Sequence, residues 1–214
     1  MNKTDVAALR QTYSQNELLE ENVLENPFKQ FEKWFKEAFD VQILEPNAMT
    51  LSTVSDGKPH ARIVLLKGFD ENGFVFYTNY LSSKGNEVAQ TPFVSLTFFW
   101  SDLERQVRIE GSIEKVSELE SDYYYHSRPR GSQIGAWVSN QSSVIAGREV
   151  IEQRLAELEK EFKEKEIIPR PAHWGGYCVY PERIEFWQGR PNRLHDRILY
   201  TKFGDNWKIE RLSP

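Results

Sequence analysis

The sequence predicts a mainly β fold with surrounding helices, arranged as a barrel or a sandwich. Between residues 48 and 116, apolar side chains recur largely at every second position, which is the period of half-buried strands. The segments SDGK and DENG interrupt this stretch, and Gly and Asp there supply the positive backbone angles that tight hairpin turns require. With 214 residues, of which 39% are hydrophobic, the chain is long enough to bury a core.

A polar arm is expected over residues 1–25, followed directly by a helix. Within the arm, four residues have the spacing of a single helical face: Val6, Leu9, Arg10 and Tyr13. Asn26 followed by Pro27 is typical of a helix start, because the first helical position needs no hydrogen-bond partner for its nitrogen. The helix is predicted to bury the face that carries Phe28, Phe31, Trp34, Phe35, Ala38 and Phe39.

Five strands are expected next, and five strands in a row favour a barrel or a sandwich. They are the segments AMTLSTV, PHARIVLLKGF, FVFYTN, FVSLTFFW and RQVRIEGSIEKV. In the last segment, strand alternation places Gln106, Arg108 and Glu110 on one face and Val107 and Ile109 on the other. A polar outward face of a barrel strand has the same pattern as a binding site, so the pattern alone assigns Gln106 no role.

Two helices and three further strands complete the prediction. SELESDYYYHS begins with a capping box formed by Ser117 and Glu120. The second helix, REVIEQRLAELEKEFKEK, has an apolar side made of Val150, Ile151, Leu155, Leu158 and Phe162. Strand patterns return in GGYCVYPERIEFWQG and in a closing hairpin, ILYTKFGDNWKIERL, with its turn at GDN. We therefore expect a single domain over residues 26–214 after the arm.

Composition narrows the classes of function. The formal net charge of −5 disfavours a nucleic-acid-binding protein, which usually presents a strongly basic surface, so a basic cluster is expected to serve a small anion. Cys178 is the only cysteine, which excludes an intramolecular disulfide and a cysteine-based zinc site, and no metal is expected. The N-terminal residues contain no apolar run long enough for a signal peptide or a membrane span, so we expect a cytoplasmic protein.

Hydrogen-bond donors are concentrated in HSRPRGSQIGAWVSNQS, residues 126–142, around a small apolar group of Ile134, Ala136 and Trp137. A second donor set is ARIVLLK, in which strand parity points Arg62 and Lys67 to opposite faces. One ligand could contact both cations only through a bulge or at a strand end. Otherwise the two could serve different anions, or they could simply be surface charges that flank a buried strand.

RLHDR, residues 193–197, is the third basic segment. If it is extended, alternation places Arg193, His195 and Arg197 on one face and turns Leu194 and Asp196 away. Three such groups in a row need an anion, an electron-rich ring or acidic side chains on a neighbouring strand to stabilise them. A histidine between two arginines can donate to a ligand, or exchange a proton with it, near neutral pH.

Two weaker signals accompany these segments. Ser82, Ser83, Lys84 and Gly85 open a predicted helix, where free backbone amides and a lysine would suit a phosphate. Serine at a helix start is also commonly just a cap. Trp187 in EFWQGR is either a core residue or a platform for a ligand ring.

In chain order, ARIVLLK, FYTN, RQVRIEG, SRPRGSQIGAW, IEFWQG and RLHDR resemble the pyridoxine (pyridoxamine) 5′-phosphate oxidase family. The likeness runs from about Leu9 to the C-terminal RLSP. It implies an FMN-binding split β-barrel with surrounding helices, assembled as a homodimer that holds FMN at the subunit interface. It also implies oxidation of pyridoxamine 5′-phosphate and pyridoxine 5′-phosphate to pyridoxal 5′-phosphate, with O₂ reduced to hydrogen peroxide.

The resemblance further implies roles for individual residues. The cofactor set is Arg62, Ile63, Val64, Leu65, Leu66, Lys67, Tyr77, Thr78, Ser83, Lys84, Gln106, Gln141, Ser142, Trp187 and Arg197. The substrate set is Arg10, Tyr13, Lys67, Tyr124, Arg128, Ser132, Arg193, Leu194 and His195. Arg193 and His195 are implied as the catalytic pair that orients the substrate and assists proton removal. Arg10 and Tyr13 match an N-terminal lid that excludes water.

One departure from the family pattern affects the cofactor phosphate. Ser83 stands where the family often has an arginine, which predicts one fewer charge-assisted contact to that phosphate.

Two other functions fit the same residues. The first is a flavin-dependent reductase on the same barrel with a nicotinamide donor. Rapid NAD(P)H oxidation without formation of pyridoxal phosphate would favour this reductase. The second is a module that stores flavin or pyridoxal phosphate without catalysis. Bound FMN with no oxygen consumption on addition of pyridoxamine phosphate would favour the storage module.

Overall fold

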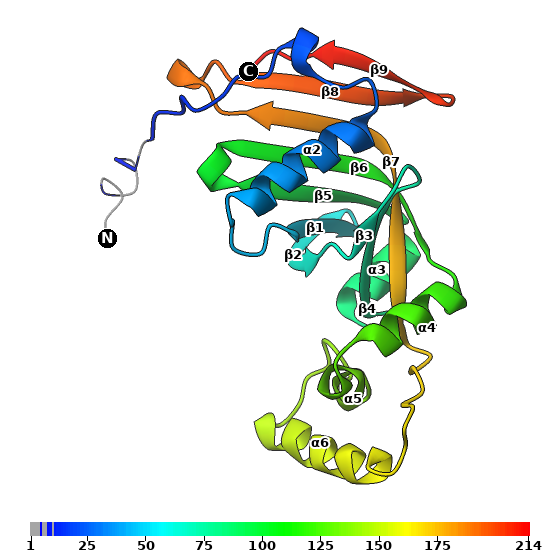
Figure 1. Cartoon of the computed structure of the whole chain (residues 1–214). Coiled ribbons are helices and arrows are strands. Elements are labelled where there is room, and N and C mark those ends of the chain that lie inside the picture. The colour runs from blue at the N-terminus through cyan, green and yellow to red at the C-terminus, as the bar shows by residue number, and fades with distance from the viewer. Residues whose placement is uncertain (1–4, 6–7, 10) are drawn as a thin grey trace. The chain divides into compact units, whose positions relative to one another are not determined.

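The described strands join into one nine-stranded sheet (Figure 1). The structure is a computed structural model, and it describes residue 5, residues 8–9 and residues 11–214. The strands are β1 (Ala48–Ser55), β2 (Lys58–Leu65), β3 (Gly68–Phe69), β4 (Phe74–Asn79), β5 (Phe93–Trp100), β6 (Arg105–Lys115), β7 (Trp174–Gln188), β8 (Asp196–Phe203) and β9 (Asn206–Arg211). They are hydrogen-bonded in the order β2-β1-β5-β6-β7-β4-β3, and β8 pairs with both β7 and β9. The predicted mainly β fold with added helices is confirmed.

Helices precede the sheet and interrupt it (Figure 1). They are α2 (Pro27–Asp40), α3 (Ser83–Gln90), α4 (Glu118–Ser127), α5 (Arg130–Val138) and α6 (Arg148–Phe162), with short 3₁₀ turns η1 (Glu20–Asn22), η2 (Ser101–Leu103) and η3 (Pro191–Arg193). Helix α5 lies in the donor-rich stretch and is not among the predicted helices, because Gly131 and Gly135 lower its helix propensity. Within the described residues, no helix has the length and apolarity needed to cross a membrane.

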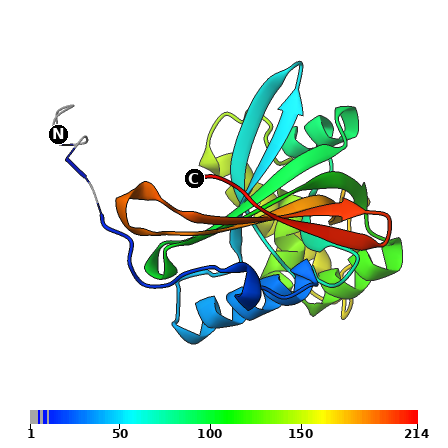
Figure 2. The ribbon, with the colours of Figure 1, turned by 90° about the horizontal axis from the view of Figure 1, so that it is seen from above.

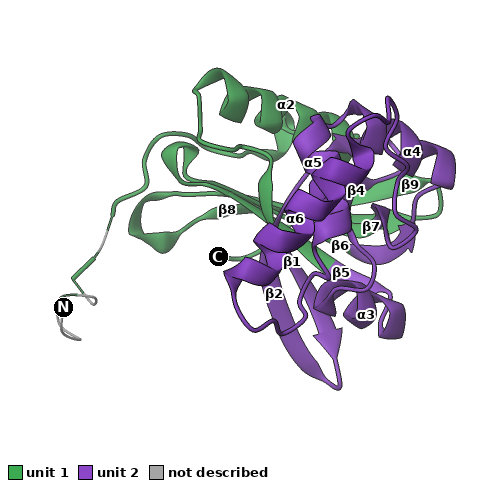
Figure 3. Cartoon of the chain, turned by 90° about the horizontal axis from the view of Figure 1, so that it is seen from below, with its two compact units in different colours: residues 1–50, 95–110, 181–214 green, residues 51–94, 111–180 purple. Residues whose placement is uncertain are grey.

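The chain divides into two compact units, which Figure 3 shows in different colours. Unit 1 comprises residues 1–50, 95–110 and 181–214, and unit 2 comprises residues 51–94 and 111–180. Strands β1, β5, β6 and β7 contribute residues to both units. Each unit carries its own part of the predicted site.

Helix α2 supplies much of the core of unit 1. The Asn26 side chain accepts hydrogen bonds from the backbone N–H groups of Phe28 and Lys29, so the predicted start is confirmed. The ring of Trp34 meets that of Phe186 on β7 edge to face, with centroids 5.2 Å apart. The buried face was predicted one residue too wide, since Phe39 is 67% exposed at the last turn of the helix.

The strands β8 and β9 form the closing hairpin of unit 1 (Figure 2). Strand β8 also pairs with the second half of β7, and this register places Trp187 opposite Arg197. Two residues of the predicted site are thereby held side by side on rigid strands.

The N-terminal arm has neither helix nor strand over residues 11–19, and η1 begins at Glu20. The predicted single helical face is wrong for this part of the arm, where polar residues leave too few apolar contacts to support a helix. Val6 and Arg10 lie outside the described residues. Hydrogen bonds and ion pairs to β8 and β9 hold the arm in place of helical packing.

Unit 2 packs its helices against an aromatic core. Buried residues of α4, α5, α6, β7 and the loop between α6 and β7 form one cluster: Tyr125, Ile134, Leu158, Phe162, Ile168 and Trp174. Figure 1 shows α5 and α6 side by side. The predicted capping box is confirmed in part, because the Ser117 hydroxyl accepts from the Glu120 N–H. The predicted apolar side of α6 is buried at Leu158 and Phe162, whereas Val150 is 44% exposed.

Candidate functional site

Three residues of the predicted cofactor set meet in unit 2. The Gln141 side-chain oxygen accepts a hydrogen bond from Thr78 Oγ1 at 3.2 Å and another from Lys84 Nζ at 3.1 Å. The three residues come from β4, the first turn of α3 and the loop after α5. Segments far apart in the sequence thus place an ammonium, a hydroxyl and an amide at one point, a donor set that suits a phosphate.

The start of α3 fixes Lys84. Ser82 caps the helix, with its hydroxyl accepting from the Gly85 N–H. At Gly85 the helix passes so close to the preceding loop that a Cβ atom would lie 2.0 Å from the Tyr80 carbonyl oxygen. Burial lowers the pKa of Lys84, and the positive charge of Arg62 lowers it further. Ser83 is exposed on this turn and carries no charge.

Arg62 on β2 does not present a free positive charge. Its Nη2 atom lies 2.6 Å from a carboxylate oxygen of Glu87, and its Nη1 atom lies 2.5 Å from the Thr53 hydroxyl. Burial by itself raises the pKa of Glu87, but hydrogen bonds from Thr53 and Arg62 outweigh it and hold that pKa below its usual value. Glu87 has no recognisable signal in the sequence, because α3 and β2 become neighbours only in the fold.

The ARIVLLK segment does not continue as one strand to its last residue. Strand β2 stops at Leu65, and the Lys67 N–H donates to the Val75 carbonyl at 2.8 Å. The predicted opposite facing of Arg62 and Lys67 assumed one continuous strand, and that assumption is wrong. Among the neighbours, Ile63 is exposed, Val64 and Leu65 are half-buried, and Leu66 is buried.

Lys67 and Tyr124 line a cavity of about 360 Å³ in unit 2. Tyr77, a predicted cofactor residue, lines it as well and stacks on Tyr124 with ring centroids 3.8 Å apart. Burial raises the pKa of both phenols, so both remain protonated donors at neutral pH. The cavity also includes Glu120, whose carboxylate lies 3.5 Å from the Tyr77 hydroxyl.

Arg128 has an unsatisfied buried nitrogen. Its guanidinium lies 4.5 Å from the centre of the Trp174 ring, and its Nη1 atom is buried with no hydrogen-bond partner among the described residues. Burial lowers the pKa of this arginine. A buried guanidinium N–H without an acceptor is costly, so the site favours an anionic ligand. Ser132, the other predicted residue here, is half-buried in the first turn of α5.

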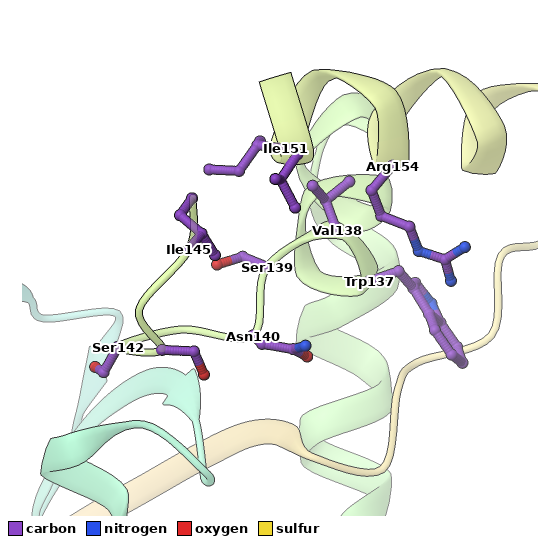
Figure 4. Close-up of a pocket in the computed structure, with 10 residues that line it drawn as sticks. Trp137, Val138, Ser139, Asn140, Ser142, Ile145, Ile151 and Arg154 are labelled. Atoms are coloured by element: carbon purple, nitrogen blue, oxygen red, sulfur yellow. The ribbon is translucent and has the colours of Figure 1, made fainter. Parts of the chain in front are cut away.

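The loop after α5 borders a second cavity of unit 2, of about 390 Å³ (Figure 4). Ser139, Asn140 and Ser142 reach it from the loop, and Trp137 and Arg154 reach it from α5 and α6. Ser142 has a left-handed backbone, with φ of 73°. It follows Gln141 directly in the chain and is exposed.

Three of the predicted site residues in unit 1 have rings that lie close together. The rings of Trp187 and His195 have centroids 4.6 Å apart, and the Tyr13 ring meets each of them at 5.8 Å. Tyr13 and His195 also line a cavity of about 580 Å³, together with Arg193. Trp187 is half-buried, so it is neither a core residue nor a fully exposed platform.

Arg193 does not extend β8. The segment before His195 forms the 3₁₀ turn η3, in which Asn192 and Arg193 have φ of 57° and 63°. The predicted row of three side chains on one strand face is therefore wrong, because the strand begins only at Asp196. Arg193 and Leu194 are exposed on this turn, and Leu194 is 67% exposed.

His195 is held by the backbone. The Arg190 N–H donates to its Nδ1 atom at 3.1 Å, so the neutral ring carries its proton on Nε2. Burial lowers the pKa of His195, the positive charge of Arg193 lowers it further, and Asp196 opposes both. The neutral form of the ring is therefore favoured, and its Nε2–H can donate to a ligand.

Arg197 is paired with a carboxylate that the sequence did not single out. Two of its nitrogens lie 2.7 and 3.1 Å from the two oxygens of Glu185, its neighbour on β7. This pairing raises the pKa of Arg197. Gln106 is half-buried on β6. The predicted alternation of β6 is confirmed, with Val107 and Ile109 fully buried on the other face.

Comparison with known sequences gives two family matches. Residues 35–161 match a family described as pyridoxamine 5′-phosphate oxidase, and residues 174–214 match the pyridoxine 5′-phosphate oxidase C-terminal dimerisation region. A relative from Cyanothece sp. named pyridoxine/pyridoxamine 5′-phosphate oxidase is 58% identical, covering 98% of both chains. A relative of the same name from Burkholderia mallei is 57% identical, covering 99% of this chain and 100% of its own.

A solved structure shares the fold over nearly the whole chain. PhzG from Burkholderia lata 383, determined in complex with tetrahydrophenazine-1-carboxylic acid, superposes with a TM-score of 0.85 at 29% identity. The match covers 92% of this chain and 98% of that one.

Proposed function

We propose that this chain, which belongs to the pyridoxamine 5′-phosphate oxidase family, oxidises pyridoxamine 5′-phosphate and pyridoxine 5′-phosphate to pyridoxal 5′-phosphate. FMN is the proposed cofactor, and the described donors fit it. Unit 2 gathers Lys84, Thr78 and Gln141 around one point, as a phosphate requires. When bound, FMN would accept a hydride from the substrate and pass the electrons to O₂, which leaves as hydrogen peroxide; with the amine substrate, water would supply the aldehyde oxygen and the amino group would leave as ammonia.

The buried Nη1 atom of Arg128 is the observation that carries the proposal. A substrate phosphate would give that nitrogen the acceptor it lacks within the described chain. Lys67, Tyr124 and Ser132 would supply further donors to the same phosphate. Several charge-assisted hydrogen bonds together would offset the cost of removing the phosphate from water.

His195 and Arg193 are proposed to orient the reacting end of the substrate. In the structure, His195 Nε2 carries the proton of the neutral ring, which suits donation to a substrate oxygen or nitrogen. Arg193 stands on a turn beside it and contributes a full positive charge. Tyr13 and the arm would exclude water from this end. Arg197, with Gln106 and Trp187, would contact the cofactor and stabilise negative charge on it.

A homodimer is the proposed assembly, with FMN held at the interface between subunits. The match of residues 174–214 to a dimerisation region supports it. The proposed location is the cytoplasm.

A steady-state assay in air tests the proposed reaction. Protein loaded with FMN receives pyridoxamine 5′-phosphate while pyridoxal 5′-phosphate, O₂ and peroxide are followed. We expect one pyridoxal phosphate and one peroxide per O₂ consumed. Turnover of NAD(P)H without pyridoxal phosphate would instead identify a flavin reductase, and bound FMN without O₂ uptake would identify a storage module.

An Arg193→Ala variant tests the catalytic assignment. Because Arg193 is exposed on η3 and outside the phosphate donors of unit 2, its loss should reduce turnover far more than FMN content. Equal losses of turnover and FMN content would contradict the assignment.

A further inference from the structure

The N-terminal arm rests on a seat built from two residues that have no assigned role, Glu104 and Gly189. One carboxylate oxygen of Glu104 accepts hydrogen bonds from two successive backbone N–H groups, that of Ser14 at 2.8 Å and that of Gln15 at 3.0 Å. Glu104 is only 7% exposed, so these bonds are largely shielded from water. The residue next to this pair on the arm is Tyr13.

Gly189 makes room for Tyr13. A Cβ atom added at Gly189 would lie 2.7 Å from Tyr13 Cγ and 2.8 Å from Tyr13 Cβ. The Gly189 N–H donates to the Glu104 carbonyl at 2.7 Å, so the two seat residues are joined by their backbones. Any larger residue at 189 would displace either the arm or the turn that carries Glu104.

Glu104 holds an unusual backbone conformation at this position. Its φ of 54° lies in the left-handed region, which is uncommon for residues other than Gly, Asn and Asp. The Gln188 side chain donates to the carbonyls of Leu103 and Glu104 at 3.1 and 3.2 Å, and these two hydrogen bonds hold the turn in place. The fold thus maintains a strained turn that aims a glutamate at the arm.

A second set of contacts fixes the arm further along. The Leu18 N–H donates to Asp196 at 3.0 Å, and Arg211 binds the Leu18 carbonyl at 2.8 Å and both carboxylate oxygens of Glu20. Tyr13 directly precedes the first of these two anchors in the chain, so the contacts of Ser14 and Gln15 with Glu104 are the ones that hold it beside Trp187 and His195. Release of the first anchor alone would free Tyr13 while Leu18 stays bound.

We propose that Glu104 and Gly189 are positioning residues that hold the arm so that Tyr13 closes the cavity beside Arg193 and His195. This inference rests on the proposed function, because it assigns the seat a task in that reaction. The seat acts before substrate arrives, since its hydrogen bonds join protein groups alone. Pre-positioning of Tyr13 lowers the cost of ordering the arm when substrate binds.

Two amide variants separate the reach of the side chain from the strain of the backbone. Glu104→Gln keeps the length of the side chain and an oxygen that can accept from Ser14 and Gln15. Glu104→Asn keeps the same amide but is one methylene shorter, and Asn tolerates a positive φ better than Gln does. If reach matters, Gln retains the seat and Asn loses it; if only backbone strain matters, Asn is the better replacement.

Hydrogen exchange of the peptide that covers residues 11–18 measures how well the seat protects the arm amides, and this measurement does not depend on catalysis. We expect Glu104→Asn to accelerate exchange at Ser14 and Gln15 by about tenfold or more, as loss of hydrogen bonds to a charged group implies. Glu104→Gln should lie between it and the wild type. Gly189→Ala, an independent change, should accelerate the same amides because its Cβ displaces Tyr13.

Steady-state kinetics of the FMN-loaded variants complete the test. Glu104→Asn and Gly189→Ala should raise the KM for pyridoxamine 5′-phosphate about fivefold or more, with a smaller change in kcat and unchanged FMN affinity. Equal protection of the arm in the Gln and Asn variants would overturn the proposal, and so would an unchanged KM in a variant with a released arm. Absence of turnover in the wild type would refute the proposed function. The exchange data would still show whether Glu104 and Gly189 hold the arm in place.

Discussion

At the residue scale, two arginines predicted to hold the cofactor are paired with buried carboxylates. Arg62 binds Glu87 and Thr53, and Arg197 binds both oxygens of Glu185. Such pairing orients a guanidinium but also cancels part of its charge. The local balance of charge, more than the number of cations, therefore sets the affinity for an anionic cofactor.

A Glu87→Gln variant should bind FMN more tightly than the wild type. The change removes one negative charge beside Arg62 and Lys84, while Gln can still accept from Arg62. Removal of that negative charge lowers the electrostatic cost of bringing a phosphate to the site, by an amount that depends on distance and is reduced by salt. We expect a gain of about threefold to thirtyfold in titrations that follow flavin fluorescence.

Riboflavin, which lacks the phosphate, is the matched control for Glu87→Gln. Its affinity should be the same for both proteins. Weaker FMN binding by the variant would instead mean that Glu87 serves mainly to aim Arg62, and the charge argument would be wrong.

His195 should titrate below its usual pKa of 6.5. Burial and Arg193 both disfavour the charged ring, so Arg193→Gln should shift the titration upward, though not fully, because burial remains. Well above pH 6.5 the ring is neutral in the folded and unfolded chain alike, so its titration adds nothing to stability there. As the pH falls below 6.5, the unfolded chain takes up the proton first, so the free energy of unfolding decreases.

NMR titration of the His195 ring protons measures both values directly. The two proteins are compared in the same buffer, with His126 on α4 as an internal reference. An unchanged or lower pKa in Arg193→Gln would exclude the electrostatic coupling between the two residues.

At the element scale, the sequence predicts strands and hairpins better than turns and short helices. β1, β4, β5, β6 and the β8–β9 hairpin follow the period-two pattern, because burial of one face imposes that period on the residues. Helix α5 was missed, since nine residues with two glycines have a weak local signal. The turn at Asn192 and Arg193 was also missed, because positive φ at non-glycine residues is set by tertiary contacts.

The same limit applies to the site. The family resemblance implied that Thr78, Lys84 and Gln141 share one site, and the structure brings these three residues to one point. The motifs could not predict the carboxylates of Glu87 and Glu185, because partners on other strands and helices have no fixed spacing in the sequence. Roles for the site residues stay predictions until they are measured.

A Gly85→Ala variant tests the close approach of α3 to the loop before it. Its Cβ would lie 2.0 Å from a backbone oxygen of Tyr80, which cannot move without disturbing the cap at Ser82. We expect a loss of about 2–4 kcal/mol in the free energy of unfolding and a Tm lower by roughly 5–12 °C. FMN affinity should fall as well, because Lys84 stands on the same turn.

Gly131→Ala in α5 is the matched control for the α3 variant. It makes the same chemical change in a helix where a Cβ meets nothing within 4 Å. Helix propensity predicts a stability equal to that of the wild type or up to about 1 kcal/mol higher. Similar melting temperatures for the Gly85 and Gly131 variants would contradict the steric argument.

At the scale of the whole molecule, the account predicts a homodimer. Sedimentation equilibrium should give about 50 kDa, twice the 25.1 kDa of the chain, at concentrations that support full activity. Removal of the region from residue 174 onward would unfold unit 1, so dilution of the intact protein is the better test. Full activity in a preparation that is monomeric throughout would contradict a cofactor held between subunits.

The claim on which the whole account depends is direct electron transfer from a phosphorylated pyridine substrate to bound FMN. The most direct test mixes the FMN-loaded protein with pyridoxamine 5′-phosphate in the absence of oxygen. We expect the flavin absorbance to bleach, with one pyridoxal 5′-phosphate formed per FMN, and to return when air is admitted. A flavin that keeps its absorbance at saturating substrate, while the protein remains folded and loaded, would contradict the account.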